Sequence, residues 1–136
     1  MATYALSIED RGDYLHARIT GINSRESVLG YTQQIFEACV AAKRTAVLIE
    51  EDLVGPSLPI SSIFQLVDAR VPQALQALKK IAYVDVNPEH DPGRMEFAED
   101  RAVNMGVNMR LFRTVDAART WLEGRGSSTA RSTALG

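Results

Sequence analysis

The alternation of hydrophobic and polar residues at the start of the chain predicts two β-strands. Residues 3–8 alternate, and their hydrophobic face consists of Tyr4, Leu6 and Ile8. Residues 14–19 alternate again, with Leu15, Ala17 and Ile19 on one face and Tyr14, His16 and Arg18 on the other. A DRGD turn separates the two runs, so the pattern predicts a β-hairpin with one face against a core.

A helix, a strand and a second helix are predicted after the hairpin. Asn23 or Ser24 caps the first helix, which ends near Lys43 and Arg44. The spacing from Asn23 to Glu26 fits a loose capping box. Residues 45–49 are continuously β-branched and apolar, which is typical of a central strand.

Apolar residues then recur at helical spacing from Ile60 to Val71. Pro72 follows directly, and it has no amide hydrogen to continue the ladder of helical hydrogen bonds. We therefore expect a break or kink at Pro72, followed by a short helix that buries Leu75 and Leu78.

The second half of the chain repeats the alternation of strand and helix. Residues 81–86 and 109–112 are predicted strands. Asp91 and Pro92 begin the helix between them, which Gly106 ends, and its inward residues are Met95, Ala98 and Ala102. Thr114 caps a last helix whose Trp121 is expected in the core.

The order of predicted elements defines the fold class as α/β, with strands and helices in the order ββαβαβαβα. Alternating strands and helices favour right-handed crossovers and a mostly parallel sheet of five strands. The opening hairpin adds an antiparallel edge strand, and the helices are expected mainly on one face. Residues 1–123 form this single domain, and the small, polar residues 124–136 are expected to be a disordered tail.

Composition narrows the function classes. The chain has 136 residues, 46% of them hydrophobic and 24% charged, and a net charge of −2. No basic patch for nucleic acid, membrane-spanning stretch or secretory signal is evident, so we expect a cytoplasmic protein. The only cysteine, Cys39, is predicted to be a buried apolar side chain rather than a nucleophile.

Four stretches resemble one known group of proteins: YLHARITGINSRES, TAVLIEEDLVG, KKIAYVDV and MRLFRTVDAARTWLEG. They are similar to the STAS fold of bacterial anti-sigma-factor antagonists and, more closely, to uncharacterised STAS-like (STAS/Sec14-like) proteins with a SpoIIAA-like fold. The resemblance covers about residues 3–124. It implies a sheet with helices mainly on one side, a binding or regulatory role, frequent self-association and no established catalysis.

Anti-sigma-factor antagonists carry a phosphorylatable serine in the loop after the central strand, within a pattern like Asp-x-Ser-x-x-Asp-Ser-Ser/Thr-Gly. The corresponding EEDLVGPSLPISS lacks the Asp-Ser-Ser/Thr-Gly run. Ser57, Ser61 and Ser62 are nevertheless the candidates for phosphorylation, because a phosphate there would lie at a helix N-terminus. The alternative is that these serines only cap the helix.

Acidic residues gather where two predicted strands end. Glu50, Glu51 and Asp52 follow one strand, and Asp85 and His90 follow the next. Carboxyl ends of parallel strands often form ligand sites, and these oxygens could hold Mg²⁺ or form salt bridges. His90 could also approach Glu50 or Ser57 for acid–base chemistry. We predict no metal, no cofactor and no catalytic residue.

The loop after Ile49 is the predicted contact surface, with Leu53, Val54 and Leu58 beside the acids. The sequence thus predicts a non-catalytic binding or regulatory module with a protein partner, which could be a second copy of the chain. Two alternatives remain: a small-molecule or lipid-binding protein that uses this loop, and a weak hydrolase-type enzyme.

Overall fold

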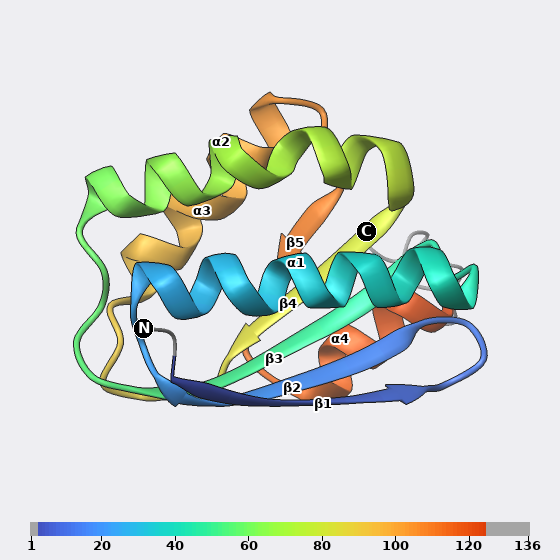
Figure 1. The fold of residues 1–136 in the computed structure, drawn as a ribbon, viewed down its shortest axis with the longest axis horizontal. Coiled ribbons are helices and arrows are strands. Elements are labelled where there is room, and N and C mark those ends of the chain that lie inside the picture. Colours follow the sequence, from blue (N-terminus) through green and yellow to red (C-terminus); the bar gives the residue numbers. More distant parts are fainter. Residues whose placement is uncertain (1–2, 125–136) are drawn as a thin grey trace, which may run out of the picture.

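The computed structural model describes residues 3–124, so the predicted tail lies outside the described residues except for Gly124. The strands are β1 (Tyr4–Asp10), β2 (Leu15–Ile22), β3 (Ala46–Val54), β4 (Lys80–Asp85) and β5 (Met109–Leu111). The helices are α1 (Arg25–Ala42), α2 (Ile60–Ala77), α3 (Pro92–Asn104) and α4 (Val115–Glu123). Figure 1 shows their arrangement.

The strands lie in one sheet in chain order, β1-β2-β3-β4-β5. β1 pairs with β2 in antiparallel register, and the other pairs are parallel, so the predicted α/β fold is confirmed. In the central strand β3, Glu51 pairs with Ile19 of β2 on one side and with Asp85 of β4 on the other. This register sets three neighbouring strand ends at one edge of the sheet, which we call the carboxyl edge.

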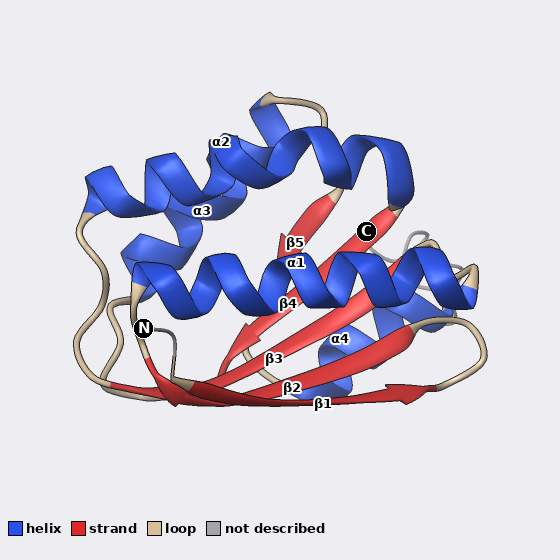
Figure 2. Cartoon of the chain, in the orientation of Figure 1, coloured by secondary structure: helices blue, strands red, loops and turns tan. Residues whose placement is uncertain are grey.

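The two faces of the sheet have separate cores, because successive side chains of a strand point to opposite faces. Ile49 and Leu53 of β3 pack in the larger core with residues of α1, α2 and α3. Ala46 and Leu48 pack in the smaller core with Ala118 of α4. Three helices therefore cover one face and α4 covers part of the other (Figure 2), as predicted.

Three of the helices have side-chain caps. Ser24 accepts a hydrogen bond from the amide of Ser27, Asp91 caps α3, and Thr114 caps α4. The predicted capping box at Asn23 is wrong, since Ser24 takes the cap position. The Asn23 side chain donates instead to the carbonyl of Pro56, at 2.8 Å.

The predicted break at Pro72 is also wrong. α2 continues through Pro72 to Ala77 as one helix. Buried Leu66, Val71 and Ala74 lie on both sides of the proline, and their packing holds the helix together although one backbone hydrogen bond is missing. Leu75, predicted to be buried, is 52% exposed because it lies on the outer face of this continuous helix.

In the smaller core, the burial of Tyr14 and of Trp121 differs from what the sequence predicts. Tyr14 lies with His16 and Arg18 on the strand face opposite the larger core, as the alternation predicts, but it is 1% exposed because it packs beneath α4. Trp121 is only partly buried. Its ring contacts Phe112, with ring centroids 5.5 Å apart, and the cationic groups of Lys80 and Arg110 lie over the ring.

Candidate functional site

The three consecutive acids do not form one cluster. β3 extends to Val54, so the loop begins five residues later than predicted and the acids lie within the strand. Alternation then sends Glu51 toward α1–α3, and Glu50 and Asp52 toward the opposite face. A strand that ends at Ile49, as the sequence predicts, would leave all three acids in a loop and would not separate them.

Glu50 and Asp52 form ion pairs with β2 on the face that carries α4. His16 Nε2 lies 2.8 Å from Glu50, and Arg18 lies 3.4 Å from Glu50 and 3.5 Å from Asp52. These contacts join two parallel strands near the carboxyl edge. The predicted salt-bridge alternative therefore describes Glu50 and Asp52, whose cationic partner Arg18 lies on β2.

Glu51 lies on the other face and is 5% exposed. The Tyr83 hydroxyl donates a hydrogen bond to Glu51 Oε2, and the Tyr31 hydroxyl lies 3.3 Å from that of Tyr83. Burial raises the pKa of Glu51 to about 8; the bond from Tyr83 lowers it, and the nearby charge of Asp85 raises it further. Glu51 is thus a neutral carboxylic acid at pH 7 inside the larger core.

Tyr83 shares this environment. Its pKa is raised well above the ordinary value by burial and by the charges of Glu51 and Asp85. Tyr83 and Tyr31 were not singled out from the sequence, because a tyrosine in a buried strand or helix carries no motif. The strand register could have indicated them, because Tyr83 and Asp85 lie on the same face of β4 and Glu51 pairs with Asp85 on the neighbouring strand.

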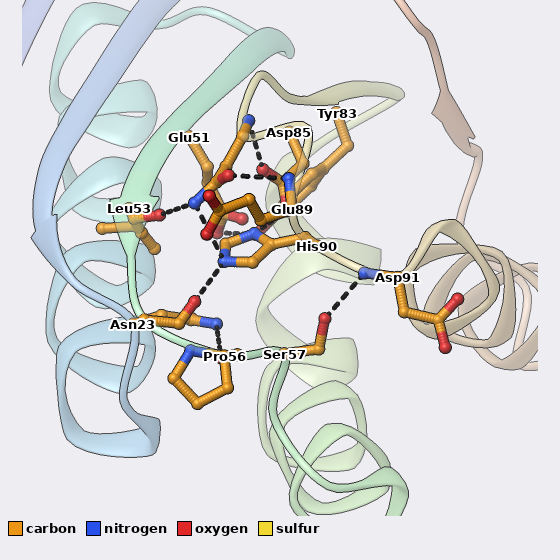
Figure 3. Close-up of polar contacts among 12 residues, drawn as sticks. Asn23, Glu51, Leu53, Pro56, Ser57, Tyr83, Asp85, Glu89, His90 and Asp91 are labelled. Carbon is orange, nitrogen blue, oxygen red and sulfur yellow. Dashed lines mark hydrogen bonds and ion pairs between the residues drawn. The ribbon is translucent and has the colours of Figure 1, made fainter.

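His90 joins two loops at the carboxyl edge (Figure 3). Its Nδ1 lies 2.6 Å from Asp85 Oδ2, and its Nε2 lies 2.8 Å from the carbonyl oxygen of Gly55. Asn87 reinforces the link by donating to the carbonyl of Leu53, at 2.7 Å. Nε2 of His90 therefore holds the loop that connects β3 with α2, while Nδ1 anchors the ring to Asp85 at the end of β4.

The three serines have different surroundings. Ser57 Oγ accepts a hydrogen bond of 2.8 Å from the amide of Asp91 (Figure 3). Ser61 and Ser62 lie in the first turn of α2, where Ser61 is exposed and Ser62 is half-buried. Pro59 occupies the cap position of α2 and provides no capping side chain, so none of the three serines is the predicted cap.

The predicted contact loop is only partly at the surface. Leu53 is fully buried in β3, Leu58 is half-buried, and Val54 is 57% exposed. Two residues missed from the sequence complete an apolar surface: Ile22, which pairs with Val54 across β2 and β3, and Val86, which follows β4. We call Ile22, Val54 and Val86 the carboxyl-edge patch.

A mostly apolar pocket of about 140 Å³ lies between the sheet and helices α1, α2 and α3. Its wall includes Glu51 and Tyr83 from the sheet and Ser57 and His90 from the loops. The predicted candidates Glu51, Leu58, Asp85 and His90 thus meet at one pocket, whereas Glu50 and Asp52 lie outside it.

Neither a metal-binding cluster nor a membrane-spanning helix is found among the described residues. Among residues 3–124, no three His, Cys, Asp or Glu side chains are grouped so that they could hold a metal ion. No helix in this part of the chain is long and apolar enough to cross a membrane.

Comparison with known proteins identifies solved structures with a similar fold. Neither family models nor curated protein sequences give a match. Among solved structures, an anti-sigma-factor antagonist from Mycobacterium paratuberculosis is similar, with a TM-score of 0.58 and 16% identity over 89% of this chain and 95% of that one. Unphosphorylated SpoIIAA, also an anti-sigma-factor antagonist, has a TM-score of 0.52 and 18% identity over 88% of this chain and 99% of that one.

A third similar structure is an uncharacterised protein of the DUF3478 family with a SpoIIAA-like fold, from Shewanella loihica. It has a TM-score of 0.53 and 19% identity over 90% of this chain and 95% of that one. The resemblance stated from the sequence is therefore confirmed for the fold: the chain has the SpoIIAA-like α/β fold of anti-sigma-factor antagonists.

Proposed function

We propose that the protein is a non-catalytic binding module that acts in regulation by engaging a protein partner through the carboxyl-edge patch. The observation that carries this proposal is the exposure of three neighbouring apolar side chains. Ile22 is 48% exposed, Val54 57% and Val86 39%, at the ends of adjacent strands that α4 leaves uncovered. Contiguous exposed apolar side chains of this kind are typical of contact surfaces.

The similar structures support a protein as the partner. Two of them are anti-sigma-factor antagonists, a name that describes action on another protein. Charged residues flank the patch on the same face, since Asp52 lies two residues and Glu50 four residues before Val54 on β3, and Arg18 lies four residues before Ile22 on β2. An apolar centre with a charged rim is the usual anatomy of a protein interface.

The surroundings of His90 favour binding over catalysis. A general base needs a ring nitrogen within reach of the proton that it removes. Both ring nitrogens of His90 already contact Asp85 and the carbonyl of Gly55, and Ser57 accepts from a backbone amide instead. His90 and Ser57, the pair considered for acid–base chemistry, are therefore both already hydrogen-bonded within the protein.

The test is an affinity capture from the native cells with the tagged protein and three variants. We expect Val54→Asp and Ile22→Asp each to lose the same captured protein that the wild type retains. Val40→Asp is the matched control, because Val40 is 63% exposed but lies near the end of α1, at the other edge of the sheet. Loss of the partner in the Val40 variant alone, or in none, would contradict the proposal.

The same experiment distinguishes two further outcomes. A captured second copy of the chain, lost in the Val54 variant, would make the interaction a self-association. Mass spectrometry of the tagged protein tests phosphorylation, for which Ser61 is the favoured position because it is exposed in the first turn of α2. Phosphopeptides absent under several growth conditions would count against a phosphorylation switch.

A further inference from the structure

The pocket behind the sheet has the volume of a small organic molecule. Its 140 Å³ is walled mainly by aliphatic and aromatic side chains, among them Phe36, Ile49, Ile63, Leu66, Val71 and Ile81. An apolar protein cavity of about 150 Å³ holds benzene. The pocket therefore has room for about six to eight heavy atoms, which is too little for the acyl chain of a membrane lipid.

One polar group on the wall has an unused hydrogen-bonding atom. Glu51 Oε2 accepts from Tyr83, and Oε1 has no hydrogen-bond partner among residues 3–124. The Tyr83 hydroxyl donates to Glu51, and the Tyr31 hydroxyl, 3.3 Å away, is placed to donate to the Tyr83 oxygen in turn. With Oε2 accepting, the acid proton of neutral Glu51 resides on Oε1, which can donate to a molecule in the pocket.

The cations on the pocket wall are already paired with protein acceptors. Arg70 donates to Thr32 Oγ1 at 2.9 Å, to Gln73 at 3.1 Å and to the carbonyl of Leu29 at 2.7 Å. Arg94 donates to the carbonyl of Leu58 and lies 3.6 Å from Asp91. Neither arginine is arranged to receive an anion, so the pocket favours an uncharged occupant.

We propose that this pocket binds a small, neutral, mostly apolar molecule whose single acceptor oxygen takes a hydrogen bond from Glu51. This inference is independent of the carboxyl-edge patch, which lies on the opposite face of the sheet. A ketone, an ether or an alcohol of about seven heavy atoms has the required chemistry.

The proposal predicts that binding depends on pH through Glu51. The titratable and charged groups that share the pocket wall with Glu51 are Tyr83 and Asp85 from β4, His90 and Asp91 from the following loop, Arg70 from α2 and Arg94 from α3, and Tyr31 of α1 contacts Tyr83. Burial and Asp85 raise the pKa of Glu51 to about 8. The donor is therefore present below pH 8 and is lost above it, so affinity falls as pH rises.

The test uses cyclohexanone as the probe with an acceptor oxygen and benzene as the probe without one. Binding is followed by NMR of the methyl groups of Ile63, Leu66 and Val71, and the same spectra report that the protein stays folded. We expect cyclohexanone to bind the wild type at pH 6 and about tenfold more weakly at pH 9, since about nine tenths of Glu51 is then ionised. Surface methyls of Val40 serve as the internal control.

Two variants separate the hydrogen bond from the shape of the pocket. Glu51→Gln retains a donor without an ionisable group, so its affinity for cyclohexanone should be equal at pH 6 and pH 9. Glu51→Leu should bind cyclohexanone about three- to tenfold more weakly than Glu51→Gln, the value of one hydrogen bond, while both bind benzene. Failure of the wild type to bind cyclohexanone at pH 6 overturns the proposal, as does an equal pH dependence in Glu51→Gln.

Discussion

Replacing Glu51 by glutamine should make the protein more stable at neutral and alkaline pH. Burial raises the pKa of Glu51 from 4.5 to about 8 in the folded protein. Between these values the unfolded chain releases the proton and the folded protein retains it. The free energy of unfolding therefore falls by about 1.4 kcal/mol for each pH unit across this window, or by about 5 kcal/mol in total.

The direction of this pH dependence determines how the free energy of unfolding should be measured. Glu51 contributes most to the free energy of unfolding below pH 4.5. Its contribution falls as the pH rises toward 8, and above about pH 8 it is constant and at its lowest. Glutamine has a similar size and no such titration. In urea unfolding at pH 4.5, 6, 7, 8 and 9, the advantage of Glu51→Gln over the wild type should grow up to pH 8 and then level off.

A second variant checks the cause of the shift. The hydrogen bond from Tyr83 lowers the pKa of Glu51, so Tyr83→Phe should raise that pKa and extend the window to higher pH. Parallel pH profiles for Glu51→Gln and the wild type would refute the reasoning, because Glu51 would then titrate alike in the folded and unfolded states.

Three other substitutions test the packing. Trp121→Ala should cost about 2 kcal/mol in urea unfolding, below the 3–5 typical of a buried tryptophan, because the Trp121 ring is only partly covered. Pro72→Ala should raise the melting temperature by several degrees, since it restores a hydrogen-bond donor inside α2; an unchanged or lower value would mean that the helix is adapted to proline. His90→Ala should cost about 1–3 kcal/mol and speed proteolysis near Gly55, because it removes the contacts to Gly55 and Asp85; unchanged cleavage would show that other contacts hold the loop.

The fold could be predicted because each strand and helix has a clear hydrophobic period. Residues 3–8 and 14–19 alternate over a hairpin, and the β-branched run at residues 45–49 is typical of a parallel strand covered on both faces. The length of β3 could not be predicted in the same way. Glu50 and Asp52 suggest a loop, yet the strand accommodates them because β2 supplies Arg18 as an ion-pair partner and His16 as a hydrogen-bond partner.

The candidate site was predicted in its position but not in its chemistry. Glu51, Asp85 and His90 were expected at one edge because the carboxyl ends of parallel strands meet there. The pairing of Glu51 with Tyr83 depends on side-chain direction over three elements, and no local pattern contains that information. Exposed Ile22 was missed for the same reason, since its exposure depends on how far α4 extends over the sheet.

The geometry of β3 explains how one strand can support two unrelated binding surfaces. Odd-numbered Glu51 and even-numbered Val54 belong to opposite faces, so the pocket and the carboxyl-edge patch share a backbone without sharing side chains. Between them, the loop after Val54 is fixed by His90 and by the bond from Asp91 to Ser57. A substitution on one face should therefore leave the other surface in place, so the protein-binding and small-molecule proposals can be tested separately with Val54→Asp and Glu51→Gln.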